Sequence, residues 1–539
     1  MKKPDIKSIL GEIPLTAELY WYLRQAGKPP VGGYSLKRLK KAIPDWISIS
    51  NSVKIQAKRR RKVFVFSMLR YWLEQTTLLS LTLETLGHDV TMAYLPYAHW
   101  KRPINRFDLR RQALYIQDVF RPIKPLLKIL PVLDIPEMVK LPRELDDHLP
   151  KAAHRDVQYS LLREEVDTDS DLYRLRMERN FAHARRMMFW MEKHRPDVVI
   201  VPNGSMLEFG ITYFVAEYLG IPAMTYEFGE QSERLWLAQN DDVMRQDTSL
   251  MWQAREEIPL DEEEWTRIRE FFTARQGGGI WENFSRLWQG TPAQGGGKTR
   301  KSLGLDSRPM VLLPANVLGD SLTLGRHIFS KSMTDWMVRT IEYFSKRGDI
   351  QFVIRVHPGE QIGWGPSVFE ILTEKFPTLS ENIHLLSADA KVNTYDLVNA
   401  ADFGLVFTTT VGMEMAMIGL PVIVTGQTHY RGKGFTLDVD SWDSYFETLD
   451  LVLDSPDKFK PTKEQVEAAW TYAYRFFFEY PQPFPWHVQH FWESERKWPL
   501  DEVLSDEGMR LFGDTFRYLA GEPIDWGTQV GEANHLGSL

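Results

Sequence analysis

Short apolar runs alternate with helical segments along the second half of the chain. Five such runs are bounded by turn residues and have the pattern of strands covered on both faces, at 311–315, 351–356, 384–387, 403–407 and 421–425. Amphipathic periodicity predicts helices in the intervals, at 331–345, 367–376, 394–401 and 411–418. Strict alternation of strand and helix is typical of a parallel sheet with right-handed crossovers. This half of the chain is therefore predicted to be an α/β domain.

The first half shows the same alternation with longer interruptions. Strands are predicted at 63–68, 90–95, 198–202 and 221–226, with helices at 72–86 and 206–219. Helical patterns also cover much of the first 57 residues and recur near the end, at 465–478 and 506–519. We expect a helical N-terminal extension, two Rossmann-like α/β domains and a group of C-terminal helices. Their predicted limits are 1–61, 62–295, 301–460 and 461–539.

The overall composition is that of an ordinary soluble protein. Among 539 residues, 43% are hydrophobic and 25% are charged, which is enough to build a large core. The net charge of −7 does not favour a nucleic-acid partner. The sequence has no cysteine, no apolar run near the roughly 18 residues of a membrane span, and no secretory signal at its start. These features predict a cytoplasmic protein.

One basic run, at 58–62, allows two interpretations. It is either a solvated charge run ahead of the first strand or a peripheral contact with anionic lipid at the inner face of the membrane.

Common cofactor motifs are missing or incomplete. The first β-α-β unit lacks the GxGxxG of a dinucleotide-binding turn. Gly297-Lys298-Thr299 is not a P-loop, because Pro292 stands where the first glycine belongs. No histidine cluster has ligand spacing, and the single DxD, at 438–440, follows a glycine-rich loop. We therefore expect neither a metal nor another cofactor.

Polar residues gather where the predicted strands of the second domain end. Because the carboxyl ends of parallel strands meet at one edge of a sheet, these residues are expected to converge there. A helix that starts directly after a strand presents unpaired N–H groups to an anion, and hydroxyls and cations strengthen such a site. The candidates for a phosphate site are Arg326, Arg355, His357, Thr409, Thr410, Gly412, Arg431 and Lys433. Glu414, one turn into the helix, is a candidate acceptor for ribose hydroxyls.

Each of these residues also has an ordinary structural interpretation. A threonine before a helix often serves as an N-cap, and Glu414 is well placed to interact with the helix dipole. In the first domain, Glu227 and Glu230 follow the predicted strand 221–226 and are candidates for acid or base catalysis. The alternative for both is a solvated turn.

The segment GQTHYRGKGFT at 426–436, preceded by TTTVGMEMAMIG and RVHP, resembles the bacterial capsule polysaccharide biosynthesis family. That family includes capsule-linker Kdo transferases, whose corresponding loop reads G-x-P-x-Y-A-G-W-G-x-T. The residues that match this loop are Gly426, Tyr430, Gly432, Gly434 and Thr436, whereas Arg431 and Lys433 replace Ala and Trp. The specific similarity covers about 310–480.

The resemblance implies a GT-B glycosyltransferase, with two Rossmann-like domains facing a central cleft and C-terminal helices crossing back to the first domain. Residues 62–295 would then bind the acceptor and residues 301–460 the nucleotide-sugar donor. In related enzymes the histidine of an HP motif contacts the donor phosphate, which here is His357. An acidic motif supplies the base, and its nearest counterpart is Glu227-Phe228-Gly229.

The expected function is sugar transfer from a nucleotide-sugar to a glycan or lipid-linked acceptor during synthesis of a surface polysaccharide. Inverting chemistry without a metal is what the family resemblance suggests. A polyol-phosphate transferase of the teichoic-acid type and a nucleotide-sugar 2-epimerase remain as alternative enzymes. A non-catalytic partner in polysaccharide assembly or export remains as an alternative of another class.

Overall fold

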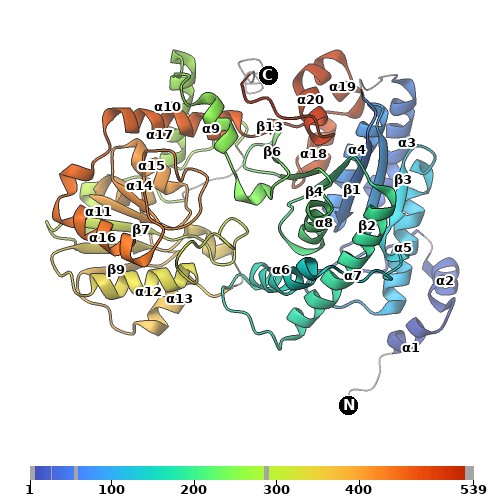
Figure 1. Ribbon diagram of the computed structural model, residues 1–539, viewed down its shortest axis with the longest axis horizontal. Coiled ribbons are helices and arrows are strands. Elements are labelled where there is room, and N and C mark those ends of the chain that lie inside the picture. Colours follow the sequence, from blue (N-terminus) through green and yellow to red (C-terminus); the bar gives the residue numbers. More distant parts are fainter. Residues whose placement is uncertain (1–5, 26, 54–58, 285–289, 364, 528–539) are drawn as a thin grey trace. The chain divides into compact units, whose positions relative to one another are not determined.

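The computed structural model describes residues 6–25, 27–53, 59–284, 290–363 and 365–527. Internal contacts divide the chain into two compact units, each built around its own sheet (Figure 1). Unit 1 comprises the described residues of Met1–Val157, Asp167–Met244 and Gln482–Ile524. Unit 2 comprises those of Gln158–Val166, Arg245–Pro481 and Asp525–Leu539.

Unit 1 contains a seven-stranded sheet in the order β13-β6-β5-β4-β1-β2-β3. Its strands are β1 (Lys62–Met68), β2 (Asp89–Leu95), β3 (Lys128–Pro131), β4 (Val198–Pro202), β5 (Ala223–Glu227), β6 (Arg234–Gln239) and β13 (Gln482–Pro483). β1 to β5 pair in parallel, whereas β6 pairs antiparallel with both β5 and β13. The central strands are buried along nearly their whole length, which explains their continuous apolar runs.

Helices cover both faces of this sheet. One face carries α3 (Lys37–Ser52), α4 (Arg70–Thr85) and α5 (Arg106–Phe120), and the other carries α7 (Asp171–His194) and α8 (Leu207–Tyr218) (Figure 1). The remaining helices are α1 (Ile6–Glu12), α2 (Thr16–Tyr20), the π-helical turn η1 (Trp21–Gln25), α6 (Arg143–Leu161), α18 (Phe491–Lys497), α19 (Leu500–Val503) and α20 (Asp506–Leu519).

Unit 2 contains a six-stranded, entirely parallel sheet in the order β12-β11-β10-β7-β8-β9. The strands are β7 (Met310–Pro314), β8 (Gln351–Arg355), β9 (Ile383–Leu386), β10 (Phe403–Val406), β11 (Val422–Val424) and β12 (Leu437–Asp438). The helices are α9 (Ser249–Arg255), α10 (Glu262–Gly277), α11 (Gly296–Ser302), α12 (Met333–Phe344), α13 (Val368–Lys375), α14 (Thr394–Ala400), α15 (Val411–Met417), α16 (Trp442–Asp454) and α17 (Lys463–Tyr474).

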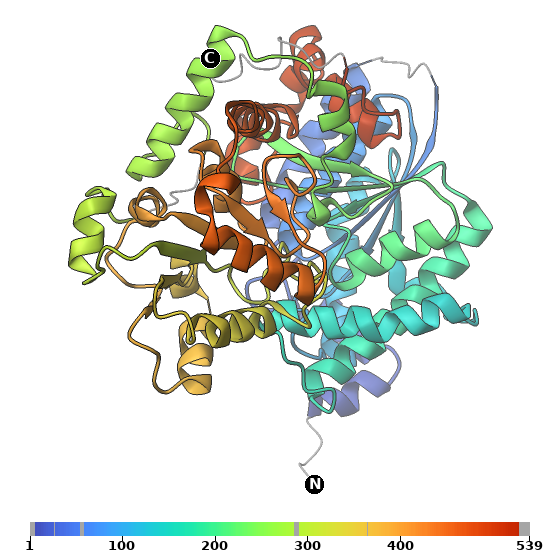
Figure 2. The same cartoon turned by 60° about the vertical axis from the view of Figure 1, so that its left-hand side comes forward.

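One large part of the core of unit 2 lies between its sheet and three helices. Side chains of α12, α13 and α16 pack on the strands in one apolar cluster, with Trp336, Phe352 and Tyr445 fully buried in it. Figure 2 gives a second view of this layered arrangement. The prediction of an α/β protein with two mainly parallel sheets is confirmed.

The unit boundaries differ from the predicted domain limits. Residues 245–295, expected in the first domain, belong to unit 2 because α9 and α10 pack there. A buried ion pair joins Arg255 of α9 to Glu479, with Nε–Oε2 and Nη2–Oε1 distances of 3.1 and 3.0 Å. The C-terminal segment is divided: α17 stays in unit 2, whereas residues 482–524 join unit 1 through β13.

Of the two helices predicted at the C-terminal end, one takes a different form. The helix expected over 465–478 is α17 followed by a π-helical turn, Arg475–Glu479. The helix expected over 506–519 is α20, with the same limits. Within the described ranges, no helix is both long and apolar enough to cross a membrane.

Candidate functional site

The strand order of unit 2 places a topological switch point between β7 and β10. From β7 the chain builds outward through β8 and β9, then returns to the other side of β7 for β10, β11 and β12. Loops leaving the carboxyl ends of the two central strands diverge at such a point, and doubly wound proteins bind ligands there. The predicted phosphate-binding turn, Thr408 to Gly412, follows β10 directly. We call the loops after β7, β8, β10 and β11 the unit 2 rim.

Two hydrogen bonds hold the threonine turn in place. The Thr408 N–H donates to Asn316 Oδ1 (3.2 Å), which joins the ends of β10 and β7. The Tyr430 hydroxyl donates to the Thr409 carbonyl (2.6 Å), which joins the turn to the loop after β11. Gly412 leaves room for this phenol, because a Cβ there would lie 2.3 Å from the Tyr430 hydroxyl oxygen. Of the residues matching the family loop, Tyr430 therefore shapes the turn directly.

The loops after β7 and β11 are also bonded to each other. The Gln427 N–H donates to the Arg326 carbonyl (2.7 Å), and His327 forms an isolated antiparallel bridge with Gly426. The side chain of Arg326 is mostly buried at this junction. Backbone contacts thus bring Arg326, Thr409, Thr410 and Gly412 into one part of the rim, as expected of parallel strand ends.

The glycine-rich loop after β11 is closed by its own polar residues. Arg431 donates from Nη1 to the Val424 carbonyl (2.9 Å) and from Nη2 to the Val439 carbonyl (2.7 Å). Asp438, the first residue of the DxD, accepts from the Gly432 N–H (2.6 Å). These side chains fix the loop between β11 and β12. Lys433 lies half-buried on the same loop, and burial lowers its pKa, while Asp247 and Glu256 act in the opposite direction.

Arg355 and His357 flank the end of β8 and point to different neighbours. The buried guanidinium of Arg355 donates to the carbonyls of Ser387 and Ala390, which belong to the loop after β9. His357 is exposed, and its Nδ1 accepts from the Gly359 N–H (3.0 Å) at the start of a short 3-10 turn, Pro358–Ile362. The Glu360 carboxylate in that turn accepts from the Ser367 hydroxyl (2.7 Å) and the Val368 N–H (3.1 Å), at the start of α13.

Glu414 lies inside unit 2 and not on its rim. Its side chain is 2% exposed, and Oε1 accepts from Arg275 Nε of α10 (2.9 Å). Arg275 Nε also lies 2.9 Å from the Tyr395 hydroxyl of α14. Burial raises the pKa of Glu414, and the Arg275 charge opposes that rise. Within the fold, this carboxylate therefore joins α15 to α10.

Unit 1 has a second switch point, between β1 and β4. β2 and β3 lie on one side of this pair, and β5 lies on the other. Glu227 ends β5, next to β4, and its Oε2 accepts from Asn203 Nδ2 (3.0 Å). Burial raises the pKa of Glu227, whereas hydrogen bonds from Asn203 and the Phe228 N–H lower it. The result is a half-buried carboxyl at the carboxyl end of a parallel sheet, with a raised pKa.

Asn203 is the residue that sequence reasoning does not single out. It follows β4 with φ +62°, and its Oδ1 accepts from the N–H groups of Ser205 and Met206 (3.2 and 3.1 Å). Gly204 follows at φ +79°, where a Cβ would lie 2.4 Å from Thr225 Cγ2. An Asn-Gly pair directly after a buried strand is a recognisable turn signal and would have pointed here.

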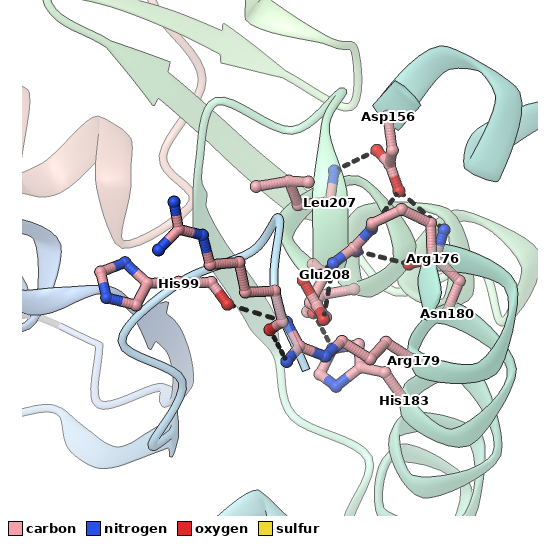
Figure 3. A network of polar contacts seen from close by, with 10 residues as sticks. His99, Asp156, Arg176, Arg179, Asn180, His183, Leu207 and Glu208 are labelled. Atoms are coloured by element: carbon pink, nitrogen blue, oxygen red, sulfur yellow. Dashed lines mark hydrogen bonds and ion pairs between the residues drawn. The ribbon is translucent and has the colours of Figure 1, made fainter. Parts of the chain in front are cut away.

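A buried polar network fixes the first turn of α8 (Figure 3). Asp156 Oδ1 accepts from the Leu207 N–H (2.6 Å), and its Oδ2 accepts from Arg176 Nε (3.1 Å). Arg176 Nη2 also donates to Glu208 Oε2 (2.9 Å) and is completely buried. Although burial alone would lower it, the Glu208 and Asp156 carboxylates raise the pKa of Arg176 above its ordinary value. The network holds the start of α8, and hence the Asn203 turn, in one position.

The predicted residues of unit 2 fall into three groups. The threonine turn, Gly412 and Arg326 share the switch point. His357 and Lys433 lie on neighbouring loops, whereas Arg355, Arg431 and Glu414 have charged groups engaged within the fold. Glu227 lies on the sheet edge of unit 1. Their roles in binding and catalysis stay predictions. Among the described residues, no three acidic, histidine or cysteine side chains are grouped closely enough to hold a metal ion.

Two doubly wound α/β units with polar switch points define a class of fold shared by many nucleotide-binding enzymes. No model of a protein family and no curated protein matches the sequence. Similar solved structures include the beta Kdo 2,4 transferase of Thermosulfurimonas dismutans KpsC, which is 15% identical, with 54% of this chain and 82% of that chain covered and a TM-score of 0.35.

The beta Kdo 2,7 transferase of the same KpsC is 13% identical, with coverages of 58% and 90% and a TM-score of 0.31. The UDP-GlcNAc 2-epimerase of Neisseria meningitidis, bound to UDP-GlcNAc, is 12% identical, with coverages of 77% and 99% and a TM-score of 0.25. These are likenesses of fold.

Proposed function

We propose that the protein is a metal-independent glycosyltransferase that moves a sugar from a nucleotide-sugar to a glycan or lipid-linked acceptor of a bacterial surface polysaccharide. Unit 2 binds the donor phosphate, and unit 1 activates the acceptor. The reaction takes place in the cytoplasm, at the inner face of the membrane. The observation that carries the proposal is the position of the family-like threonine turn at the switch point of unit 2.

The donor half of the proposal rests on chemistry at the rim. Thr409 and Thr410 offer hydroxyl and backbone donors at the start of α15, and His357 and Lys433 supply further donors from neighbouring loops. We assign these four residues to the donor phosphates. Arg355 donates to carbonyls of the loop after β9, and Arg431 donates to the carbonyls of Val424 and Val439, so both act as positioning residues for neighbouring segments.

The acceptor half of the proposal rests on Glu227. Its carboxylate takes the proton of an acceptor hydroxyl while that oxygen forms a bond to the anomeric carbon of the donor. The bond from the same carbon to the phosphate oxygen breaks, and the nucleotide leaves with its additional negative charge. His357 and the threonine turn stabilise that charge. Attack and departure on opposite faces of the sugar make the transfer inverting.

The test is a donor panel. The purified protein is incubated with UDP-, GDP-, TDP- and CMP-sugars, and free nucleotide is measured together with thermal stabilisation by each nucleotide. We expect one nucleotide to stabilise the protein and its sugar to be hydrolysed slowly without an acceptor. His357→Ala should reduce both signals. If no nucleotide is released and none stabilises the protein, the transferase proposal is wrong.

Product analysis separates the transferase from the other two enzyme classes. Sugar without its phosphate is the transferase product, whereas a polyol-phosphate transferase carries the phosphate to the acceptor. A 2-epimerase yields the epimeric sugar. Stabilisation by a nucleotide without any turnover, in the presence of acceptor extracts, would favour the non-catalytic assembly partner.

A further inference from the structure

The N-terminal helices carry an apolar face that unit 1 does not cover. Along α1, α2 and η1, eight large hydrophobic side chains are exposed: Ile6, Ile9, Ile13, Leu15, Leu19, Tyr20, Tyr22 and Leu23. Ile6 is 72% exposed and Leu23 is 77% exposed. We call these eight side chains the N-terminal apolar face. Isolated exposed apolar residues are ordinary, but eight of them within one short segment of the chain indicate an interaction surface.

The polar side chains of the same helices face the protein. Lys7 Nζ lies 3.0 Å from Asp108, Glu12 lies 2.8 Å from Arg106, and Glu18 accepts from Arg110 Nε (3.0 Å). All three partners belong to α5, the helix beside which α1 and α2 lie in Figure 1. Charged side chains therefore tie these helices to α5, while their large apolar side chains stay exposed.

Close backbone packing holds the helices in this orientation. Gly11 is buried against α5, where an added Cβ would lie 2.7 Å from the Phe107 nitrogen. Arg110 Nη1 donates to the carbonyls of Gly11 (3.1 Å) and Ile13 (2.9 Å). Trp21 is buried nearby, in edge contact with Tyr115 of α5. The exposure of the apolar face is therefore fixed by specific contacts.

The segment of sequence that carries this face is basic, unlike the whole chain. Residues 6–41 contain seven lysines and arginines but only two acidic residues, within a protein of net charge −7. Glu12 and Glu18, the two acidic residues, already pair with arginines of α5. Arg24, Lys28, Lys37 and Lys41 are exposed. Exposed apolar side chains that include tyrosines, on a segment rich in exposed basic residues, match the interface of an anionic bilayer.

We propose that the N-terminal apolar face docks this protein on an anionic lipid surface. The isoleucine and leucine side chains enter the boundary between headgroups and acyl chains, Tyr22 lies at the headgroup level, and exposed basic side chains of the same segment bind lipid phosphates. A second copy of the chain is the weaker candidate for this face, because it would bring two equally basic surfaces together. The inference concerns docking and does not depend on the transferase proposal.

The test is vesicle flotation with the full-length protein, without donor or acceptor. Vesicles of phosphatidylcholine with about one quarter phosphatidylglycerol are compared with pure phosphatidylcholine vesicles. We expect binding to the anionic vesicles and little binding to the neutral ones. The double variant Leu19→Glu/Leu23→Glu should lower the bound fraction at least about tenfold, because it puts two negative charges into the apolar face.

A matched control separates this face from exposed leucines in general. Leu250→Glu/Leu451→Glu makes the same change at two exposed leucines of unit 2, which are 70% and 52% exposed. This variant should bind vesicles as the wild type does, and both variants should keep the wild-type unfolding temperature, because all four side chains are exposed. Equal binding by the wild type and Leu19→Glu/Leu23→Glu would overturn the proposal, as would no binding by the wild type. A dimer seen by light scattering and lost in Leu19→Glu/Leu23→Glu would assign the face to a second copy and would also overturn it.

Discussion

The side chain of Asn203 makes two different contacts, one through each of its polar atoms. Its Oδ1 caps the turn that leads into α8, and its Nδ2 donates to the carboxylate of Glu227. The first contact requires a left-handed backbone, which asparagine tolerates better than most residues. The second favours the ionised form of a carboxyl whose pKa burial raises. Asn203 is therefore a positioning residue for Glu227 under the proposed function.

Glu227→Gln tests the base at this scale. The variant should abolish sugar transfer and leave nucleotide binding unchanged, because the amide keeps its shape but accepts no proton. In the wild type, the pKa of Glu227 is raised, so the transfer rate should fall with decreasing pH at a point above the range of an ordinary glutamate. Asn203→Ala removes a bond to the ionised form and should move this fall to still higher pH. Initial rates across a pH series measure both effects.

Glu230 provides the matched control for that experiment. It lies three residues further along the same segment and was the other candidate from sequence. Glu230→Gln should retain transfer. Loss of transfer in Glu230→Gln together with normal transfer in Glu227→Gln would move the base assignment to Glu230.

At the scale of whole elements, the loop after β11 shapes the threonine turn that precedes α15. Tyr430 reaches from that loop to the Thr409 carbonyl, and Gly412 is the residue that lets it pass. Arg431 and Asp438 keep the loop closed on itself. The glycine-rich motif therefore connects two loops of the rim through the Tyr430–Thr409 hydrogen bond, and we call this connection the brace. Arg431 and Asp438 hold the loop that carries Tyr430 in its closed form.

Gly412→Ala should disrupt this brace. Its new methyl group would fall 2.3 Å from the Tyr430 hydroxyl, so either the tyrosine or the turn must move. We expect unit 2 to lose about 1–3 kcal/mol of stability, the usual cost of overpacking, and nucleotide affinity to fall with it. Thermal unfolding and nucleotide titration measure the two effects. Gly348→Ala is the control, because a Cβ there meets nothing within 4 Å; similar losses in both variants would argue against the brace.

At the scale of the whole molecule, each unit has its own sheet and its own core. Each unit also contains buried histidines. Burial lowers the pKa of His429 in unit 2 to about 3, with Lys433 contributing, and lowers the pKa of His487 in unit 1 to about 4. The ring of His429 stacks on Phe476 at 3.7 Å, and its Nδ1 lies 3.0 Å from the Tyr472 hydroxyl. Both histidines are therefore neutral in the folded protein.

Acid should destabilise the folded protein through these groups. Between the folded pKa near 3 and the unfolded value of about 6.5, the unfolded chain binds more protons, so stability falls as pH falls. Each such histidine contributes up to about 1.4 kcal/mol per pH unit in that window. His429→Phe, which keeps the stacking, should flatten the pH dependence of the unit 2 unfolding transition between about pH 7 and pH 5. Replacing the exposed His490 by Phe should leave that transition unchanged, and an unchanged slope in His429→Phe would contradict the prediction.

Local pattern alone predicted most of the strands and helices of the two sheets. The strands β1, β4, β7 and β10 were expected within one residue of their limits, because buried parallel strands have continuous apolar runs between turn residues. β3, β6, β12 and β13 were not expected. β13 is two residues long, and it pairs with a strand more than 240 positions away in the sequence, which no local pattern reports.

For the candidate site, the sequence by itself determined which polar residues follow the strands. The parallel arrangement then implied that those residues share one edge of a sheet. Only the tertiary structure decided which of them face the rim and which pair inside the fold. Arg355 and Glu414 find partners on a loop and a helix that are distant in sequence, Arg431 closes its own loop, and Asn203 acquires its contact with Glu227 when β4 and β5 pair. The physical reason is that periodicity encodes burial along one element, whereas a side chain's partner depends on how several elements pack.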